Sequence, residues 1–257
     1  MNLHLENPFG EEHKPEAIRK LFNVESDFMV AEGYFESANA SIRRQEALQT
    51  IQQYSRNDDR LVPYLAMNYF DRYFSRRPIP EEPQGILNIV AICCLTLALK
   101  MRHSEFSVTA FLNEQNLNMN MKHITRMELL ILSELKWRMR SVTAICFLDF
   151  FISLFNIDDQ QLKANLKDGA ITEVIFISMQ HTIKFTQFRP SIIAASSLLA
   201  ASALMFPARL FEMREAIESC QFVQRGDLSN CIQGIISMWI VNIVKTLFPP
   251  GDPSAPS

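Results

Sequence analysis

Two apolar segments of similar length and composition constrain the fold more than any other feature of this chain. The first is ILNIVAICCLTLALK, residues 86–100, and the second is PSIIAASSLLAASALM, residues 190–205. Each is long enough for a helix, apolar on nearly all sides, and rich in small Ala, Ser and Cys side chains that let neighbouring helices approach closely. We therefore expect each segment to form a buried central helix with other helices packed around it.

The order of elements around these segments is repeated. An amphipathic helix precedes each one, and a shorter polar segment and another amphipathic helix follow it. Pro83 and Pro190 mark the two starts, where proline fits the first turn of a helix. The pattern favours a duplicated five-helix bundle joined near residues 141–143, with two unrelated helical hairpins in one bundle as the alternative. Strand-type alternation is missing, so the predicted class is all-α. The clearest helices are predicted at 61–76, 86–102, 124–137 and 232–247.

The composition excludes several classes of partner. Of the 257 residues, 48% are hydrophobic and 21% are charged, which is enough to bury a core. The net charge of −3 shows no excess of basic residues that would attract nucleic acid or an acidic lipid surface. The apolar runs at 86–99 and 190–206 are shorter than a membrane span. The five cysteines lack a C-x-x-C pattern and a preceding secretory signal, which favours reduced, buried thiols. We expect no nucleic acid and no membrane as partners.

Residues that could carry catalysis or bind a metal are sparse. No two histidines are spaced as metal ligands, and there is no Gly-rich phosphate loop and no G-x-S-x-G motif. The pairs Asp58-Asp59 and Asp158-Asp159 could suggest a magnesium site, but neither has a third aspartate one turn later. Both pairs precede a predicted helix, where a carboxylate accepts free backbone N–H groups. We therefore predict a chain without catalytic residues, metal or cofactor.

Four short patterns occur in order along the chain. They are YLAMNYFDRYFS (64–75), LALKM (97–101), RMELLILSELKWRM (126–139) and FRPSIIAASSLLAA (188–201). Together they closely resemble the cyclin box and second cyclin fold of plant D-type cyclins, over residues 41–247. The resemblance implies two consecutive five-helix bundles, in agreement with the duplication. It also implies a regulatory subunit, not an enzyme, that binds and activates a cyclin-dependent kinase and controls G1 and commitment to division.

The family's functional residues can be placed on matching positions. Taken alone, Lys100 is a cation that complements the dipole at a helix C-terminus. The resemblance implies instead that Lys100 and Glu128 lie close together and bind kinase main chain, with Met101 beside them, since lysine supplies donors and a carboxylate supplies acceptors. Arg44 and Asp71 match an internal salt bridge between the first two helices, and we interpret their role as structural.

The chain departs from the family at three places. Many members of the family carry a substrate-docking patch of large apolar side chains on the first helix. The matching positions here are Arg43, Ala47 and Thr50, so we predict weak docking of basic-hydrophobic motifs. No cysteine precedes Cys93, so the Leu-x-Cys-x-Glu motif that binds retinoblastoma-related protein is absent, and that protein is expected as at most an indirect partner.

The third departure follows the Lys-Met pair, where the family often has acidic residues and this chain has Arg102 and His103. One interpretation is two solvated residues at a helix end. The other is an altered charge complementarity that selects the partner. The short tail and the missing motif together indicate the sixth subgroup of plant D-type cyclins.

Several further expectations follow from the resemblance. Kinase inhibitor proteins are a second class of partner that it admits, and the expected location is the nucleus, with the cytoplasm as a second site. Two other functions stay open: a kinase-incompetent cyclin-like scaffold, and a cyclin-fold transcription factor, which would need a basic face and usually a zinc ribbon. The predicted divisions are an N-terminal extension with short helical segments (1–40), a kinase-binding cyclin box (41–141), a second cyclin fold (142–248) and a disordered tail (249–257).

Overall fold

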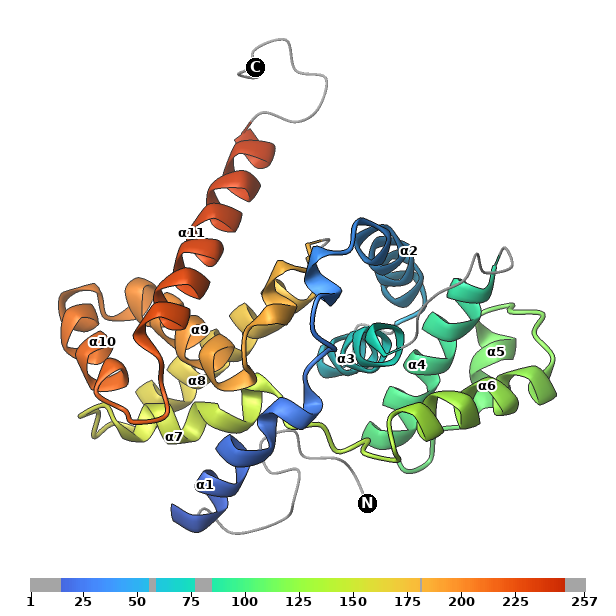
Figure 1. The fold of residues 1–257 in the computed structure, drawn as a ribbon, viewed down its shortest axis with the longest axis horizontal. Coiled ribbons are helices and arrows are strands. Elements are labelled where there is room, and N and C mark those ends of the chain that lie inside the picture. Colours follow the sequence, from blue (N-terminus) through green and yellow to red (C-terminus); the bar gives the residue numbers. More distant parts are fainter. Residues whose placement is uncertain (1–14, 56–58, 77–84, 181, 248–257) are drawn as a thin grey trace.

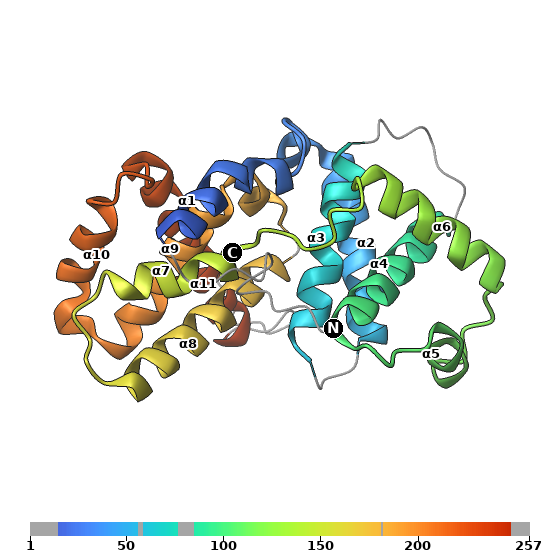
Figure 2. The ribbon, with the colours of Figure 1, turned by 90° about the horizontal axis from the view of Figure 1, so that it is seen from below.

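Helices α4 (Ile86–Arg102) and α9 (Pro190–Met205) form the centres of two bundles that lie side by side (Figures 1 and 2). The computed structural model describes residues 15–55, 59–76, 85–180 and 182–247. Every residue of α4 from Val90 to Leu99 is buried, and α9 buries most of its Ala and Ser side chains. These small side chains allow close packing on several sides.

In the part of the chain that the structure describes, each bundle consists of five α-helices. In the first, α4 packs against α2, α3 and α6, and in the second, α9 packs against α7, α8, α10 and α11. The prediction of an all-α fold with two consecutive five-helix bundles is confirmed, and no strand occurs in the described part of the chain. The remaining α-helices are α1 (Pro15–Val24), α2 (Ala38–Tyr54), α3 (Leu61–Ser75), α5 (Val108–Glu114), α6 (Met121–Glu134), α7 (Leu148–Ser153), α8 (Gln160–Ser178), α10 (Leu210–Glu218) and α11 (Arg225–Leu247). Short 3-10 helices are η1 (Glu25–Phe28), η2 (Tyr34–Glu36), η3 (Ala144–Phe147), η4 (Lys184–Gln187) and η5 (Pro207–Arg209).

Some predicted boundaries differ from the observed ones. Helix α6 ends at Glu134, so Trp137 lies outside it, and α11 begins at Arg225, seven residues before the predicted start at 232. Helix α2 begins at Ala38, so the predicted division at residue 41 falls inside a helix. Pro83 and the tail 249–257 lie outside the described residues.

Two of the predicted capping aspartates bind free N–H groups at a helix start. Asp159 caps α8, where its Oδ1 accepts from the N–H groups of Gln161 (2.7 Å) and Leu162 (3.1 Å). Asp59 Oδ1 accepts from the N–H of Leu61, the first residue of α3, at 3.0 Å. These contacts satisfy donors that a helix leaves unpaired at its N-terminus. Asp58 lies outside the described residues.

The segment from α1 to η2 binds the second bundle before the chain enters the first. Phe22 of α1 stacks on Phe222 with ring centroids 4.2 Å apart and also contacts Phe147 at 4.8 Å. Glu25, only 1% exposed, follows it. Its carboxylate accepts from the backbone N–H and the hydroxyl of Ser191, both at 2.9 Å, at the N-terminus of α9. The helix dipole and these two hydrogen bonds offset part of the cost of burying the carboxylate there.

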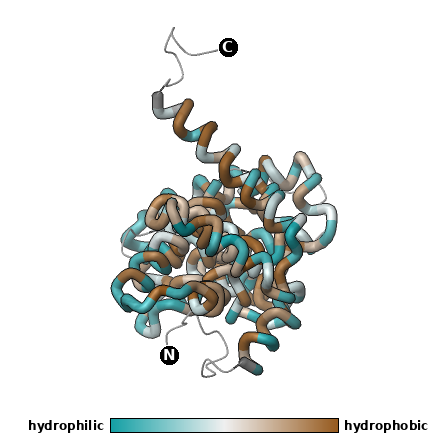
Figure 3. The backbone as a smooth tube through the Cα atoms, turned by 90° about the vertical axis from the view of Figure 1, so that its left-hand side faces the viewer, coloured by the Kyte–Doolittle hydropathy of each residue, from teal (hydrophilic) through white to brown (hydrophobic). Residues whose placement is uncertain are grey.

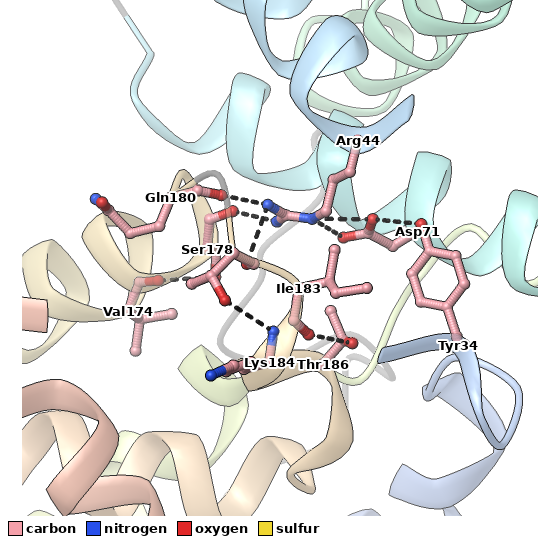
Figure 4. A network of polar contacts seen from close by, with 10 residues as sticks. Tyr34, Arg44, Asp71, Val174, Ser178, Gln180, Ile183, Lys184 and Thr186 are labelled. Atoms are coloured by element: carbon pink, nitrogen blue, oxygen red, sulfur yellow. Dashed lines mark hydrogen bonds and ion pairs between the residues drawn. The ribbon is translucent and has the colours of Figure 1, made fainter. Parts of the chain in front are cut away.

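Arg44 of α2 also joins the two bundles (Figure 4). Its Nε donates to both carboxylate oxygens of Asp71 on α3 at 3.1 Å, and Tyr34 donates to the same carboxylate. Its other two nitrogens donate to the carbonyl oxygens of Ser178 and Gln180, where α8 ends. One buried guanidinium therefore pairs with a carboxylate in its own bundle and satisfies helix C-terminal carbonyls in the other.

The second half of α11 projects from the bundle (Figures 1 and 3). Leu228, Cys231 and Ile235 in its first half are buried, whereas Ile240 and Ile243 are both 57% exposed. By length and composition alone this helix is apolar enough to cross a bilayer. A core helix of a bundle meets the same criterion, and the first half of α11 packs on α9.

Removal of Asp71 tests the contacts of Arg44. We expect Asp71→Ala to lower the free energy of unfolding by about 3–5 kcal/mol, because it leaves a buried guanidinium without its counter-charge. The measurement is urea unfolding. Asp168→Ala is the matched control: Asp168 pairs with Arg60 across the same two bundles, but its side chain is 67% exposed. The control should unfold at nearly the wild-type midpoint, and an equal loss in both variants would contradict the special role of Arg44.

A second prediction concerns Glu25 and pH. Burial raises the pKa of Glu25 above its ordinary value of 4.5, although the hydrogen bonds from Ser191 oppose the shift. The stability that Glu25 contributes is then complete below its unfolded pKa and falls as the pH rises through its folded pKa. We expect Glu25→Gln, which keeps the size and an acceptor, to gain stability relative to the wild type as the pH rises above the ordinary glutamate pKa of 4.5. The free energy of unfolding of both proteins would be measured by urea unfolding at several pH values. A difference between them that does not change with pH would contradict this prediction.

Candidate functional site

Lys100 and Glu128 meet at the surface between α4 and α6. Lys100 Nζ lies 2.8 Å from Oε1 and 2.6 Å from Oε2 of Glu128. Thr96, one turn before Lys100 on α4, donates its hydroxyl to Oε1 at 2.7 Å. The structure therefore brings together the two residues that the resemblance placed side by side, although they are 28 positions apart in the sequence.

The two members of this pair differ in burial. The Glu128 side chain is 8% exposed and the Lys100 side chain is 38% exposed. Both oxygens of the carboxylate already accept hydrogen bonds from within the chain, whereas the ammonium reaches solvent. Because a lysine ammonium has three donors, it can bind acceptors of a partner while it stays paired with Glu128. The arrangement is suited to binding a polar backbone.

Two apolar side chains lie on or just after the helices that carry the pair. Met101 follows Lys100 and is half-buried against the core. Trp137, just after α6, is 66% exposed. Lys136 and Trp137 both have positive φ, 53° and 59°, a conformation that costs non-glycine residues roughly 1–2 kcal/mol each. This turn leaves the Trp137 indole uncovered in the isolated chain.

The apolar period of the sequence predicts a helix that extends to Trp137, and a tryptophan inside such a helix is not distinguished as a site residue. A signal was present, since Lys136, Trp137 and Arg138 interrupt the apolar period of α6. After the turn, the chain is fixed by α3: Tyr69 donates to the carbonyl of Met139 at 2.7 Å, and Arg72 donates to the carbonyl of Arg138 at 3.3 Å. An exposed tryptophan on a fixed backbone is typical of an anchor residue in protein interfaces.

Arg102 and His103 are not simply two solvated residues at a helix end. Arg102 Nε donates to Oδ2 of Asp59 at 2.8 Å, and the Arg102 side chain is 21% exposed. His103 Nε2 lies 3.7 Å from the same oxygen and is 48% exposed. The interpretation of Arg102 as a solvated residue is therefore corrected: its charge is paired, and the pair connects the end of α4 to the start of α3.

The three positions of the expected docking patch present little apolar surface. Ala47 is fully buried, Thr50 is 8% exposed and Arg43 is half-buried. Thr50 donates to the side-chain oxygen of Asn88 on α4 at 2.9 Å and to the carbonyl of Glu46 at 3.1 Å. Ala47 and Thr50 therefore contribute to packing between α2 and α4.

The thiols of the chain are mostly buried, and the described residues bring no set of metal ligands together. Within the described ranges, no group of three His, Cys, Asp or Glu side chains is placed to hold a metal ion. The cysteines are free thiols, and burial raises the pKa of Cys93 and of Cys231 to about 12. A buried thiol with a raised pKa is a poor nucleophile and packs as a small apolar side chain.

The chain is similar to known proteins both in sequence and in fold. Residues 16–140 match the model of the cyclin N-terminal domain. A protein named putative cyclin-D6-1 from Arabidopsis thaliana is 37% identical over 253 residues, covering 91% of this chain and 83% of the relative. Cyclin-D6-1 from Oryza sativa subsp. japonica is 34% identical, covering 88% of this chain and 71% of the relative.

The fold comparison agrees with these relatives. The X-ray structure of a viral cyclin from herpesvirus saimiri superposes with a TM-score of 0.64 at 17% identity, covering 86% of this chain and 99% of the viral protein. At that identity the likeness shows the fold alone. The sequence matches, which extend over most of both proteins, show the family: this chain belongs to the plant D-type cyclins, in the D6 subgroup.

Proposed function

We propose that this cyclin is a regulatory subunit that binds and activates a cyclin-dependent Ser/Thr kinase and thereby controls the G1/S transition and cell division. The observation that carries the proposal is the Lys100–Glu128 pair, a partly exposed ammonium fixed on a mostly buried carboxylate. The family supports a regulatory role. The kinase supplies the catalysis, and the cyclin supplies a rigid surface.

The position of the pair suits such a surface. Lys100 extends from the last turn of α4, whose preceding ten residues are buried, so its backbone is held by the core of the bundle. Glu128 restricts the direction of its side chain, and Thr96 in turn holds the Glu128 carboxylate. A donor that is fixed before binding loses less conformational entropy when a partner docks. Trp137 and Met101 would add apolar contact to this polar centre.

The proposed action is a shift between two kinase conformations. The first bundle docks on the kinase, moves its regulatory helix inward and orders its activation segment. Binding must favour the active conformation over the inactive one, since a ligand with equal affinity for both shifts nothing. A kinase-incompetent scaffold would bind equally to both conformations, and the assay below separates the two.

Other partners and the location follow from the same proposal. Kinase inhibitor proteins would meet the assembled complex. Retinoblastoma-related protein would be at most an indirect partner, because the chain has no cysteine before Cys93 and hence no Leu-x-Cys-x-Glu motif. The complex would act in the nucleus and also occur in the cytoplasm.

Charge reversal tests the kinase interface. We expect Lys100→Glu and Glu128→Lys each to reduce phosphorylation of a histone or retinoblastoma-type substrate by the co-purified kinase at least about tenfold, because each creates like charges at the contact. Circular dichroism and urea unfolding would show that the fold is kept.

The matched control for this test is Lys167→Glu in the second bundle. Lys167 pairs with Asp149 at 2.8 Å, with side chains 22% and 38% exposed, so it resembles the Lys100 pair in geometry and lies away from it. The control should retain the wild-type activity. Unchanged activity in both Lys100→Glu and Glu128→Lys would remove the interface assignment.

The altered patch on α2 gives a separate prediction. A peptide with a basic-hydrophobic docking motif should bind this chain at least about 30-fold more weakly than a D-type cyclin that keeps the patch tryptophan, because an aromatic anchor contributes about 2 kcal/mol or more. Fluorescence polarisation would measure both affinities. Nanomolar binding that is abolished by substitutions at Ala47 and Thr50 would refute the prediction.

A further inference from the structure

Asp59 connects two helices at the edge of the Lys100 site. Its Oδ1 accepts from the N–H of Leu61 at 3.0 Å and its backbone carbonyl accepts from the N–H of Val62 at 3.0 Å, so it is fixed at the start of α3. Its Oδ2 accepts from Arg102 Nε at 2.8 Å. The Asp59 side chain is 15% exposed, which distinguishes this pair from the exposed ion pairs of the chain.

The contact falls where α4 needs support. Arg102 is the last residue of α4, and Lys100 is two residues before it, about 3 Å along the helix axis. The last turn of a helix has unpaired carbonyls and frays easily. The ion pair with Asp59 attaches this turn to a neighbouring helix, and the hydrogen bonds of Lys100 to Glu128 require a fixed backbone at the same turn.

We propose that Asp59 is a positioning residue for the Lys100–Glu128 site and acts through Arg102. This inference rests on the proposed kinase-binding function and deepens it. Asp59 also offsets the positive charge of Arg102 next to Lys100. The family often has an acidic residue where this chain has Arg102, and Asp59, 43 positions earlier, supplies a carboxylate at the same place. Asp59 thereby becomes a determinant of partner affinity without touching the partner.

The test uses variants that break the pair and keep the cap on α3. Arg102→Met removes the guanidinium and leaves the Asp59 contact with Leu61 in place, and Asp59→Asn keeps an oxygen for that contact. We expect each variant to raise the dissociation rate of the kinase by about threefold to tenfold, with the double variant no worse than the worse single one, since both break the same contact. Arg102→Lys, which keeps the charge, should restore part of the loss.

Arg60→Met provides the control. Arg60 is next to Asp59 in the sequence but pairs with Asp168 on α8, in an exposed contact. This variant should leave kinase dissociation unchanged. The urea unfolding midpoint of every variant separates a positioning role from a role in folding. If the midpoint falls together with the affinity for the kinase, and Arg102→Lys restores neither, the pair acts through stability and the proposal is overturned.

The failure of this inference can be distinguished from failure of the proposed function. If Lys100→Glu abolishes kinase binding while Arg102→Met and Asp59→Asn dissociate at the wild-type rate, the positioning role is wrong and the kinase interface stands. If Lys100→Glu and Glu128→Lys bind as the wild type does, the interface itself is wrong, and the positioning role is overturned with it.

Discussion

The arrangement of the two bundles depends on the hydrogen bonds of one buried side chain, the guanidinium of Arg44. It is 3% exposed, and a cation so placed is costly unless its donors are satisfied. Asp71 meets this need from the first bundle, where Tyr34 also donates to its carboxylate, while the carbonyls at the end of α8 meet it from the second. Each bundle therefore completes a polar centre that neither could satisfy alone.

The N-terminal segment makes the complementary connection through apolar contacts and an anion. Phe22 packs among aromatic side chains of the second bundle, and the Glu25 carboxylate binds the N-terminus of α9. Asp27 then pairs with Arg138 after α6, at the edge of the first bundle. A cation at the C-terminus of α8 and an anion at the N-terminus of α9 both complement helix dipoles. The two bundles are thus held by charges at the ends of helices as well as by their cores.

The central helices could be predicted because their signals are local. The apolar run of α4 and the proline at the start of α9 fix those elements without knowledge of tertiary contacts. The position of the left-handed turn at Lys136 and Trp137 could not be predicted from local signals. The segment after this turn is held by tertiary hydrogen bonds from Tyr69 and Arg72. The Asp59–Arg102 pair was also hidden, because residues 43 positions apart have no visible relation in a single sequence. The Lys100–Glu128 contact became predictable only through the family resemblance.

The burial of Glu128 determines how the Lys100 site can act. Its carboxylate is occupied by Lys100 and Thr96, so it has little capacity left for N–H groups of a partner, and its main effect is to orient the ammonium. The site should therefore favour backbone segments with unpaired carbonyls, such as a loop beside a helix end. Arg44 shows the same chemistry inside the chain, where a cation held by a carboxylate binds the carbonyls that end α8. In both places the carboxylate holds the cation in position, and the cation makes the contact.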